Sequence, residues 1–354
     1  MKRLSEKEII DLFVPRFKNL KLTQTTKFIC RHYCTAANIG TDDVAIVSLN
    51  RTLKEGAKLV FKCDMLVEST DVPPGMKPWQ VARKSAVSCV SDFSAKGIKP
   101  IYTSLLSIGI PRRYRKGDVL DLLRGFEISS REFGINFVGG DTNKSNELVI
   151  DCSMIGFSEN DSIPSRNGAR PGDFIVVSGE FGYPAAGLKI LVEGAKAGRN
   201  FKQKAISSVF RPNPQQEFGI SLARYFSSSI DSSDGLAISL YELAIQSNVN
   251  FFITKIPSVK AIEFFATNNK LVDRNELVFY GGEEYHIVAT IPSRNMKKLK
   301  SLVKKLKLTM IVIGKVTEGD GKVFVRRSDG KKNGFELLDK RGYLHLIGEN
   351  GGRL

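Results

Sequence analysis

Phe137-Val-Gly-Gly-Asp-Thr-Asn-Lys-Ser145 joins an apolar run to a cluster of polar side chains. The run from Ile135 to Val138 predicts a strand, and the two glycines after it predict a sharp turn whose N–H groups can face a ligand. Asp141 would then lie at the end of the strand, where α/β proteins bind ligands. With Lys144 nearby, the stretch fits a site for a cation and a phosphate. On its own, a plain Gly-Gly-Asp turn explains it equally well.

The composition is that of a soluble globular protein. The chain has 354 residues, of which 42% are hydrophobic and 25% charged, so about two domains are expected. No apolar run approaches the roughly 20 residues of a membrane span, and the N-terminus lacks the apolar core of a signal peptide. The five cysteines are scattered and form no Cys-x-x-Cys pair. A reducing, cytoplasmic location fits best.

The net charge of +16 makes nucleic acid a partner to consider. The basic residues are spread along the chain, however, and the densest run, Lys297–Lys307, carries apolar residues at helical spacing. That pattern is typical of a helix with one solvated face. The chain shows no aromatic interleaving and no zinc-finger spacing. A basic nucleic-acid-binding protein therefore remains a rival hypothesis, and nucleic acid an unlikely partner.

Strands alternate with helices on both sides of a polar, turn-rich segment, 159–173, which predicts an α/β (α+β) chain of two domains, 1–158 and 159–354. In the first domain we expect helices 78–97 and 116–133, and strands 44–49, 58–65, 101–110, 135–138 and 148–157. In the second we expect helices 184–193, 215–226, 237–246 and 297–307, and strands 174–178, 250–256, 285–291, 310–316 and 322–326.

Seven aspartates lie in turns, at strand ends or on a helix with small neighbours: Asp42, Asp43, Asp64, Asp92, Asp141, Asp231 and Asp234. If they converge, each pair about 4 Å apart costs on the order of 4 kcal/mol at an effective dielectric of 20. Such a cluster would either raise the pKa values of its carboxyl groups strongly or bind cations. Oxygen ligands favour Mg²⁺ or Ca²⁺, and an anionic substrate whose phosphates complete the shell fits Mg²⁺. Asp92, on an otherwise small and apolar helix face, needs a partner. The alternative is a set of independent turn and capping residues.

Other chemistries lack support in the sequence. The three histidines show no nucleophile-elbow or His-Glu-x-x-His context, and neither a Walker A motif nor a kinase-type glycine-rich loop is present. Direct phosphoryl transfer, which needs mainly positioning and charge, fits what remains.

Seven motifs in order resemble the thiamine-monophosphate kinase family: Asp42-Asp-x-Ala45, Asp64-x-Leu-Val-Glu68, Ser91-Asp92, Gly139-Gly-Asp-Thr142, Gly168-Ala-x-Pro-Gly-Asp173, Asp231-x-Ser-Asp-Gly-Leu236 and Gly281-Gly-Glu283. That family is similar to aminoimidazole ribonucleotide synthetase, selenophosphate synthetase and a hydrogenase maturation factor. The resemblance covers nearly the whole chain, up to Tyr343.

The resemblance implies a two-domain synthetase-like fold whose N-terminal sheet domain binds ATP and Mg²⁺ and pairs with a second copy in a barrel-like homodimer. It implies ATP-dependent phosphorylation of thiamine phosphate to thiamine diphosphate, with Asp141 and Asp231 as the catalytic pair. By motif, the Mg²⁺ ligands would be Asp43, Asp64, Asp92, Asp141, Asp231 and Asp234. Besides Asp141, the ATP contacts would be Gly140, Arg166 and Ser233. The thiamine phosphate contacts would be Glu283, Tyr343 and, at a position where the family has histidine, Asp71.

Four departures from the family pattern are present, and one of them is an extra residue, Thr41, between Gly40 and the aspartate pair. Asp71 replaces the family histidine, Cys63 replaces a hydroxyl residue, and Gly-Gly-Glu-Asp-Tyr-Glu becomes Gly-Gly-Glu-Glu-Tyr-His. Strand alternation predicts that Glu284 points away from Glu283. Another ATP-using member of the superfamily stays open as an alternative. The chain lacks the C-terminal cysteine of the hydrogenase maturation factor and the glycine-rich cysteine site of selenophosphate synthetase.

Overall fold

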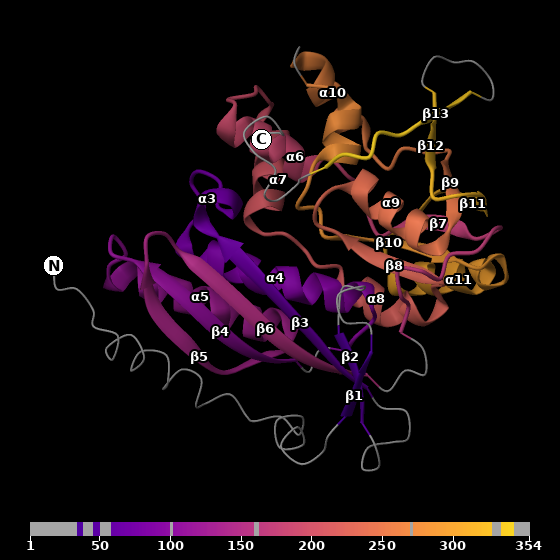
Figure 1. Cartoon of the computed structure of the whole chain (residues 1–354). Helices are drawn as coiled ribbons and strands as arrows, with labels where there is room; N and C mark the ends of the chain where they lie inside the picture. Colours follow the sequence, from indigo (N-terminus) through magenta and orange to yellow (C-terminus); the bar gives the residue numbers. More distant parts are fainter. Residues whose placement is uncertain are drawn as a thin grey trace. The chain divides into compact units, whose positions relative to one another are not determined.

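The computed structural model describes residues 34–37, 45–49, 58–99, 102–158, 163–269, 272–327 and 334–342. The chain divides into two compact units. The N-terminal unit comprises Met1–Phe93 and Ile98–Asp161, and the C-terminal unit comprises Ser94–Gly97 and Ser162–Leu354. Each unit has its own sheet with helices, which confirms the mixed α/β class (Figure 1). Within the described ranges, no helix combines the length and apolarity needed to cross a membrane.

The sheet of the N-terminal unit has the strand order β1-β2-β3-β6-β4-β5 among the described residues. Its strands are β1 (Cys34–Ala37), β2 (Ala45–Leu49), β3 (Lys58–Val67), β4 (Tyr102–Pro111), β5 (Ile135–Ser145) and β6 (Val149–Ser158). Strands β4 and β5 pair in parallel and the other pairs are antiparallel. The unit's helices are α3 (Glu68–Asp71), α4 (Pro78–Ala95) and α5 (Lys116–Phe133).

Helices α4 and α5 lie on the same face of this sheet (Figure 1). The start of α5 is capped by Asp118, which accepts a hydrogen bond from the Arg115 N–H at 2.8 Å. Its end is Gly134 at φ 70°, a left-handed cap that favours glycine. The two helices touch at Gly125, where an added Cβ would lie 2.2 Å from the Trp79 carbonyl oxygen. The predicted ranges of both helices are confirmed.

Strand β5 continues through residues 139–141 as far as Ser145, so the prediction of a sharp turn at the two glycines is wrong. The two glycines serve a close approach of two backbones instead. A Cβ added at Gly140 would lie 1.8 Å from the Leu106 carbonyl oxygen on the neighbouring strand. Asp141 consequently lies within an edge strand and not at a strand end.

The sheet of the C-terminal unit has the strand order β13-β12-β9-β11-β7-β10-β8 among the described residues. Its strands are β7 (Phe174–Val177), β8 (Ser228–Ser232), β9 (Val249–Ile253), β10 (His286–Ile291), β11 (Ile311–Glu318), β12 (Val323–Arg326) and β13 (Phe335–Leu337). Its helices are α6 (Tyr183–Val192), α7 (Arg199–Phe210), α8 (Gln216–Leu222), α9 (Leu236–Ser247), α10 (Lys260–Asn268) and α11 (Met296–Leu306), with short helical turns η1 (Ala223–Tyr225), η2 (Glu276–Tyr280) and η3 (Ser293–Asn295).

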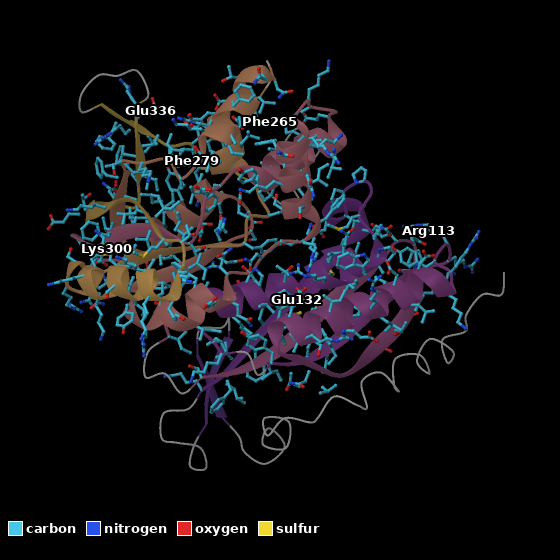
Figure 2. The ribbon with its side chains drawn as sticks, turned by 180° about the vertical axis from the view of Figure 1, so that it is seen from behind. Arg113, Glu132, Phe265, Phe279, Lys300 and Glu336 are labelled. Atoms are coloured by element: carbon cyan, nitrogen blue, oxygen red, sulfur yellow. The ribbon has the colours of Figure 1, made fainter. Side chains whose placement is uncertain are left out.

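Two apolar clusters cover the two faces of this second sheet. On one face α6, α9 and α10 pack with Val177 and Val288, and on the other α8 and α11 pack with Val176 and Ile287. Successive side chains of a strand point into one cluster and then the other, so the strands carry apolar residues on both faces. The solvated basic helix predicted at 297–307 is confirmed: in α11, Leu299 is buried while the lysines, including Lys300, are exposed (Figure 2).

Helices α7 and α10 were not predicted. Their apolar signal is short, because only Ala205 and Val209 of α7 and three residues of α10 are buried. Helix α7 rests on α6 at Gly187, where an added Cβ would lie 2.4 Å from the Ala205 carbonyl oxygen. Such a contact between two short helices depends on tertiary packing, so the periodicity of either segment does not reveal it.

The contact at Gly125 gives a test of the α4–α5 packing. The change Gly125→Ala should lower the free energy of unfolding by about 1–3 kcal/mol, because the methyl group meets the backbone of α4. The matched control is Gly117→Ala in the exposed first turn of α5, where an added Cβ meets nothing within 4 Å. It should be neutral or should stabilise by up to about 1 kcal/mol through helix propensity. Urea unfolding of both variants measures the difference, and a Gly125→Ala protein as stable as the control contradicts the packing described.

Candidate functional site

Two of the predicted Mg²⁺ ligands meet at one ammonium in the N-terminal unit. Lys62 on β3 places its Nζ 2.7 Å from Asp92 Oδ2 on α4 and 3.6 Å from Asp64 Oδ2 on its own strand. Asp92 is 4% exposed, so its carboxylate has the partner that its burial requires. Sequence reasoning did not single out Lys62. The signal available was its spacing from Asp64, since residues i and i+2 of a strand share a face.

The electrostatics of this group are those of a cation site. Burial raises the pKa of the Asp64 carboxyl above its usual value, while the nearby Lys62 ammonium opposes that rise. Two carboxylates that share one positive charge are a donor set of hard oxygen ligands, which fits Mg²⁺. Within the described ranges no three His, Cys, Asp or Glu side chains are grouped so as to hold a metal ion. Asp43, a further predicted ligand, lies outside the described residues.

Asp141 and Gly140 lie elsewhere on the same sheet. Asp141 is exposed and in register with Ser107, while Asp64 is in register with the buried Cys152. Register and alternation therefore place Asp141 on the face opposite Asp64, three strands away, or roughly 14 Å at the usual strand spacing. Within this chain the structure does not bring Asp141 to the Lys62 group.

Two departures from the family pattern have local structural roles. Asp71, in α3, accepts hydrogen bonds from the Val67 N–H at 2.7 Å and from the Thr70 hydroxyl at 3.1 Å, so its carboxylate stabilises its own turn. The exposed Cys63 donates its thiol proton to Asp151 at 3.0 Å. Partial desolvation and that hydrogen bond raise the pKa of the Cys63 thiol, which makes it a poor metal ligand.

In the C-terminal unit, residues 231–234 and 281–285 lie side by side and bring together four predicted site residues. Asp231 is the buried fourth residue of β8, and Ser233 and Asp234 follow at the start of α9. The Glu283 N–H donates to the Ser233 carbonyl at 2.6 Å. A Cβ added at Gly282 would lie 2.8 Å from the same oxygen, so the glycine is needed for this approach. The predicted ATP contact Ser233 and the predicted substrate contact Glu283 are thus neighbours.

The backbone around Glu284 is not a strand, so the alternation argument for that residue does not apply. Strand β10 begins only at His286, and Glu283 and Tyr285 have φ angles of 65° and 52° in the left-handed region. Glu284 and His286 are both largely buried. Sequence reasoning assigned them no role, because buried titratable groups in a loop leave no periodic signal.

The last two predicted contacts are farther away or not described. The Arg166 carbonyl accepts from Ser247 Oγ at 3.2 Å, at the C-terminal end of α9. Ser233 precedes the N-terminal end of that helix, which at 12 residues is roughly 18 Å long. The structure therefore places the two backbones at opposite ends of α9. Tyr343 lies outside the described residues, although its neighbour Gly342 contacts the Asp234 backbone.

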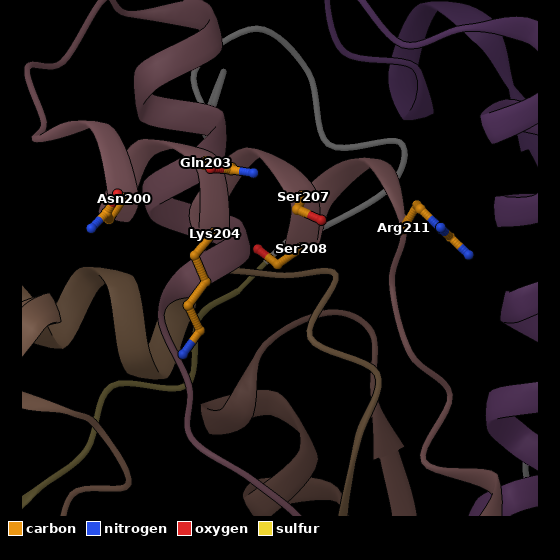
Figure 3. Close-up of a pocket in the computed structure, with 6 residues that line it drawn as sticks. All are labelled: Asn200, Gln203, Lys204, Ser207, Ser208 and Arg211. Atoms are coloured by element: carbon orange, nitrogen blue, oxygen red, sulfur yellow. The ribbon is translucent and has the colours of Figure 1, made fainter.

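A cavity of about 510 Å³ lies along α7 and contains none of the predicted residues. Its lining is polar and cationic: Asn200, Gln203, Lys204, Ser207, Ser208 and Arg211. Figure 3 shows Lys204 on α7 and Arg211 just after its end pointing in different directions, so the two cations do not converge on one ligand group. We therefore place the candidate site at the carboxylate groups described above.

Comparison with known proteins covers the whole chain. The family model "AIR synthase related protein, N-terminal domain" matches residues 41–158. Thiamine-monophosphate kinase of Nitrosopumilus maritimus is 40% identical over 346 residues, which are 98% of this chain and all of that protein. The enzyme of the same name from Pyrococcus horikoshii is 31% identical over 98% of each chain.

A solved structure shares the fold over the same length. The structure named "AaThiL complexed with AMPPCP and TMP" matches with a TM-score of 0.73 and 26% identity, over 98% of this chain and 99% of that one. The family resemblance read from the ordered motifs is confirmed. This chain belongs to the thiamine-monophosphate kinase family.

Proposed function

We propose that this protein is a kinase that transfers the γ-phosphoryl group of ATP to thiamine phosphate and forms thiamine diphosphate and ADP. The observation that carries the proposal is 40% identity with a thiamine-monophosphate kinase over the full length of that relative. A structural neighbour whose name records an ATP analogue and TMP supports both substrates. In the reaction, a phosphate oxygen of thiamine phosphate bonds to the γ-phosphorus, and the bond from that phosphorus to the β,γ-bridging oxygen breaks.

We assign the transfer to a direct, in-line step. Phosphoryl transfer needs mainly positioning and charge stabilisation, and the described thiols and imidazole do not suit a nucleophile. Cys63 is held as a thiol by Asp151, and both ring nitrogens of the half-buried His286 are hydrogen-bonded. The segment of Ser233 and Glu283 would position the substrates, because a carboxylate is a suitable neighbour for the thiazolium cation. Tyr343 would stack on one of the rings.

Mg²⁺ is the proposed cofactor, held by Asp64 and Asp92 where the structure has the Lys62 ammonium. The resemblance implies several Mg²⁺ ions, and the motif assignment names Asp43, Asp141, Asp231 and Asp234 as further Mg²⁺ ligands and Gly140 and Arg166 as ATP contacts. When bound, Mg²⁺ supplies positive charge to the phosphate oxygens of ATP. Lys62 would release the two carboxylates to the metal ion.

The exposed face of the N-terminal sheet supports the proposed homodimer. Met65, Leu105 and Val138 are 62%, 50% and 40% exposed. Met65 and Leu105 lie on the face opposite the buried Leu66 and Leu106, away from α4 and α5. Large exposed apolar side chains grouped on one face mark an interaction surface. Pairing of this face with its copy would bury it in a closed dimer.

The activity is tested by supplying ATP and Mg²⁺ with a panel of acceptors. Thiamine phosphate should give ADP and thiamine diphosphate in equal amounts, whereas a ribonucleotide acceptor and selenide should give none. Chromatography of both products measures the outcome. Turnover of another acceptor in place of thiamine phosphate would move the protein to a different branch of the superfamily.

The metal assignment predicts a specific effect of Asp64→Asn. The concentration of Mg²⁺ that gives half-maximal activity should rise by about tenfold or more, because one charged oxygen ligand is lost. The control is Asp151→Asn. Asp151 lies on the neighbouring strand β6, on the face of the sheet opposite Asp64, and its carboxylate accepts a hydrogen bond from the Cys63 thiol. It should leave the Mg²⁺ dependence unchanged. Equal responses of the two variants would count against the site.

The dimer proposal predicts that Met65→Lys combined with Leu105→Lys yields a monomer, since burying unpaired ammonium groups in the interface is strongly unfavourable. Phe264→Lys is the control, because Phe264 is 72% exposed on α10 of the other unit. Sedimentation at micromolar concentration should show a dimer for the wild type and the control. A monomeric wild type would refute the proposal.

A further inference from the structure

Two loops of the C-terminal unit meet at Glu284. One loop, residues 179–182, leads from β7 into α6, and the other, residues 281–285, leads into β10. Both loops are closely packed at a glycine: a Cβ added at Gly179 would lie 2.1 Å from His286 Cε1, and one added at Gly281 would lie 2.4 Å from the Cβ of Ala185 in α6. The carboxyl of Glu284 links them, because its Oε1 accepts a hydrogen bond from the Gly182 N–H at the N-cap of α6.

His286 is fixed by hydrogen bonds on both ring nitrogens. Nε2 lies 3.2 Å from the Glu180 carbonyl oxygen, which can only accept, so Nε2 carries a proton. Nδ1 lies 3.2 Å from Ser178 Oγ, and that oxygen already accepts from the Ile287 N–H at 2.8 Å. Because burial lowers the pKa of His286 to about 4, the ring is neutral at pH 7, so Nδ1 carries no proton and accepts a hydrogen bond from the Ser178 hydroxyl. Glu284 Oε2 lies 3.8 Å from Nε2.

The pair carries no net charge at neutral pH. Burial raises the pKa of Glu284 to about 8, although the Gly182 N–H opposes that shift. Burial likewise lowers the pKa of His286 to about 4, against the effect of the hydrogen bond to Glu180. No charged side chain is among the causes of either shift. Glu284 is thus protonated and His286 neutral between those values, which is how two such groups can be buried without a counter-ion.

This pair lies apart from the carboxylate of Asp231. Ile287 is in register with Asp231 and belongs to the apolar cluster under α8 and α11. Side chains alternate along a strand, so His286 lies on the other face of β10, toward α6. The pair is therefore directed at the loops and not at the proposed metal ligand.

The segment that the pair holds is strained. Glu283 and Tyr285, on either side of Glu284, both have positive φ, which is unfavourable for residues with a Cβ. Hydrogen bonds from their N–H groups to Ser233 and Ser232 hold the other side of the segment. Strained backbone persists only where its surroundings determine it several times over, and such places are often functional.

We propose that Glu284 and His286 are a buried positioning pair, which fixes the 281–285 segment against the start of α6 so that the Glu283 carboxylate is set for thiamine phosphate. The inference rests on the proposed function, in which Glu283 contacts that substrate. Neither residue touches the reacting atoms. Their contribution is the placement of a neighbour.

The experiment compares Glu284→Leu with Glu284→Gln in steady-state kinetics. The leucine removes the acceptor for the Gly182 N–H, so the KM for thiamine phosphate should rise between about 10-fold and 100-fold, as expected when a contact group is misplaced. The KM for ATP should stay within about twofold, because a purely structural loss would affect both substrates. The glutamine keeps a neutral acceptor and should restore the KM for thiamine phosphate to within about threefold of the wild type.

Two controls keep the outcome decisive. Val325→Ala truncates a buried side chain in β12 of the same unit and should lower Tm without splitting the two KM values. Hydrogen exchange of the Gly182 amide in the wild type should be slow, and it reads the contact even if Glu284→Leu fails to fold. Equal changes in both KM values, a glutamine variant no better than leucine, or a freely exchanging Gly182 amide would overturn the inference. A wild type without thiamine phosphate turnover would overturn the proposed function first.

Discussion

A carboxylate taken out of water must find compensating charge or hydrogen bonds, and the N-terminal unit meets this constraint with one lysine. Asp92 sits on a face of α4 that is otherwise small and apolar, and the Lys62 ammonium reaches it from β3 at 2.7 Å. The same ammonium neutralises Asp64 at 3.6 Å. The contact between α4 and the sheet therefore includes a cation between two acids. An apolar residue at 62 would leave Asp92 buried without that charge.

The C-terminal unit meets the same constraint without a cation. Glu284 is 6% exposed and has the Gly182 N–H and the His286 ring nearby. Its raised pKa means that the group is buried in its protonated form. The difference between the two solutions is physical. A group that remains charged binds cations, whereas a neutral pair serves as a fixed linkage between two loops. The first suits a metal site, and the second suits the positioning of a neighbouring substrate contact.

Much of the fold follows from local sequence rules, because α4, α5 and α11 carry complete apolar stripes with recognisable ends. Helix α7 and the course of β5 do not follow from them. The glycines at 139 and 140 look like a turn locally, and only the neighbouring Leu106 carbonyl shows that they permit a close approach. For the site, the family motifs predicted a set of aspartate ligands but not that Lys62 joins Asp64 to Asp92. The roles of Asp71 and Cys63 likewise depend on partners that only the fold supplies.

The charge balance of the protein follows from the substrates it is proposed to bind. ATP and thiamine phosphate are anionic, and a set of aspartates alone would repel them. A net charge of +16 spread over the surface attracts such ligands toward the protein, but at the site itself the cation must lie between acid and phosphate. Lys62 shows that the carboxylates of Asp64 and Asp92 already accept a cation at one place. In the proposed function, Asp64 and Asp92 would hold Mg²⁺ through their carboxylate oxygen atoms, and Lys62 would keep positive charge beside the anionic substrates.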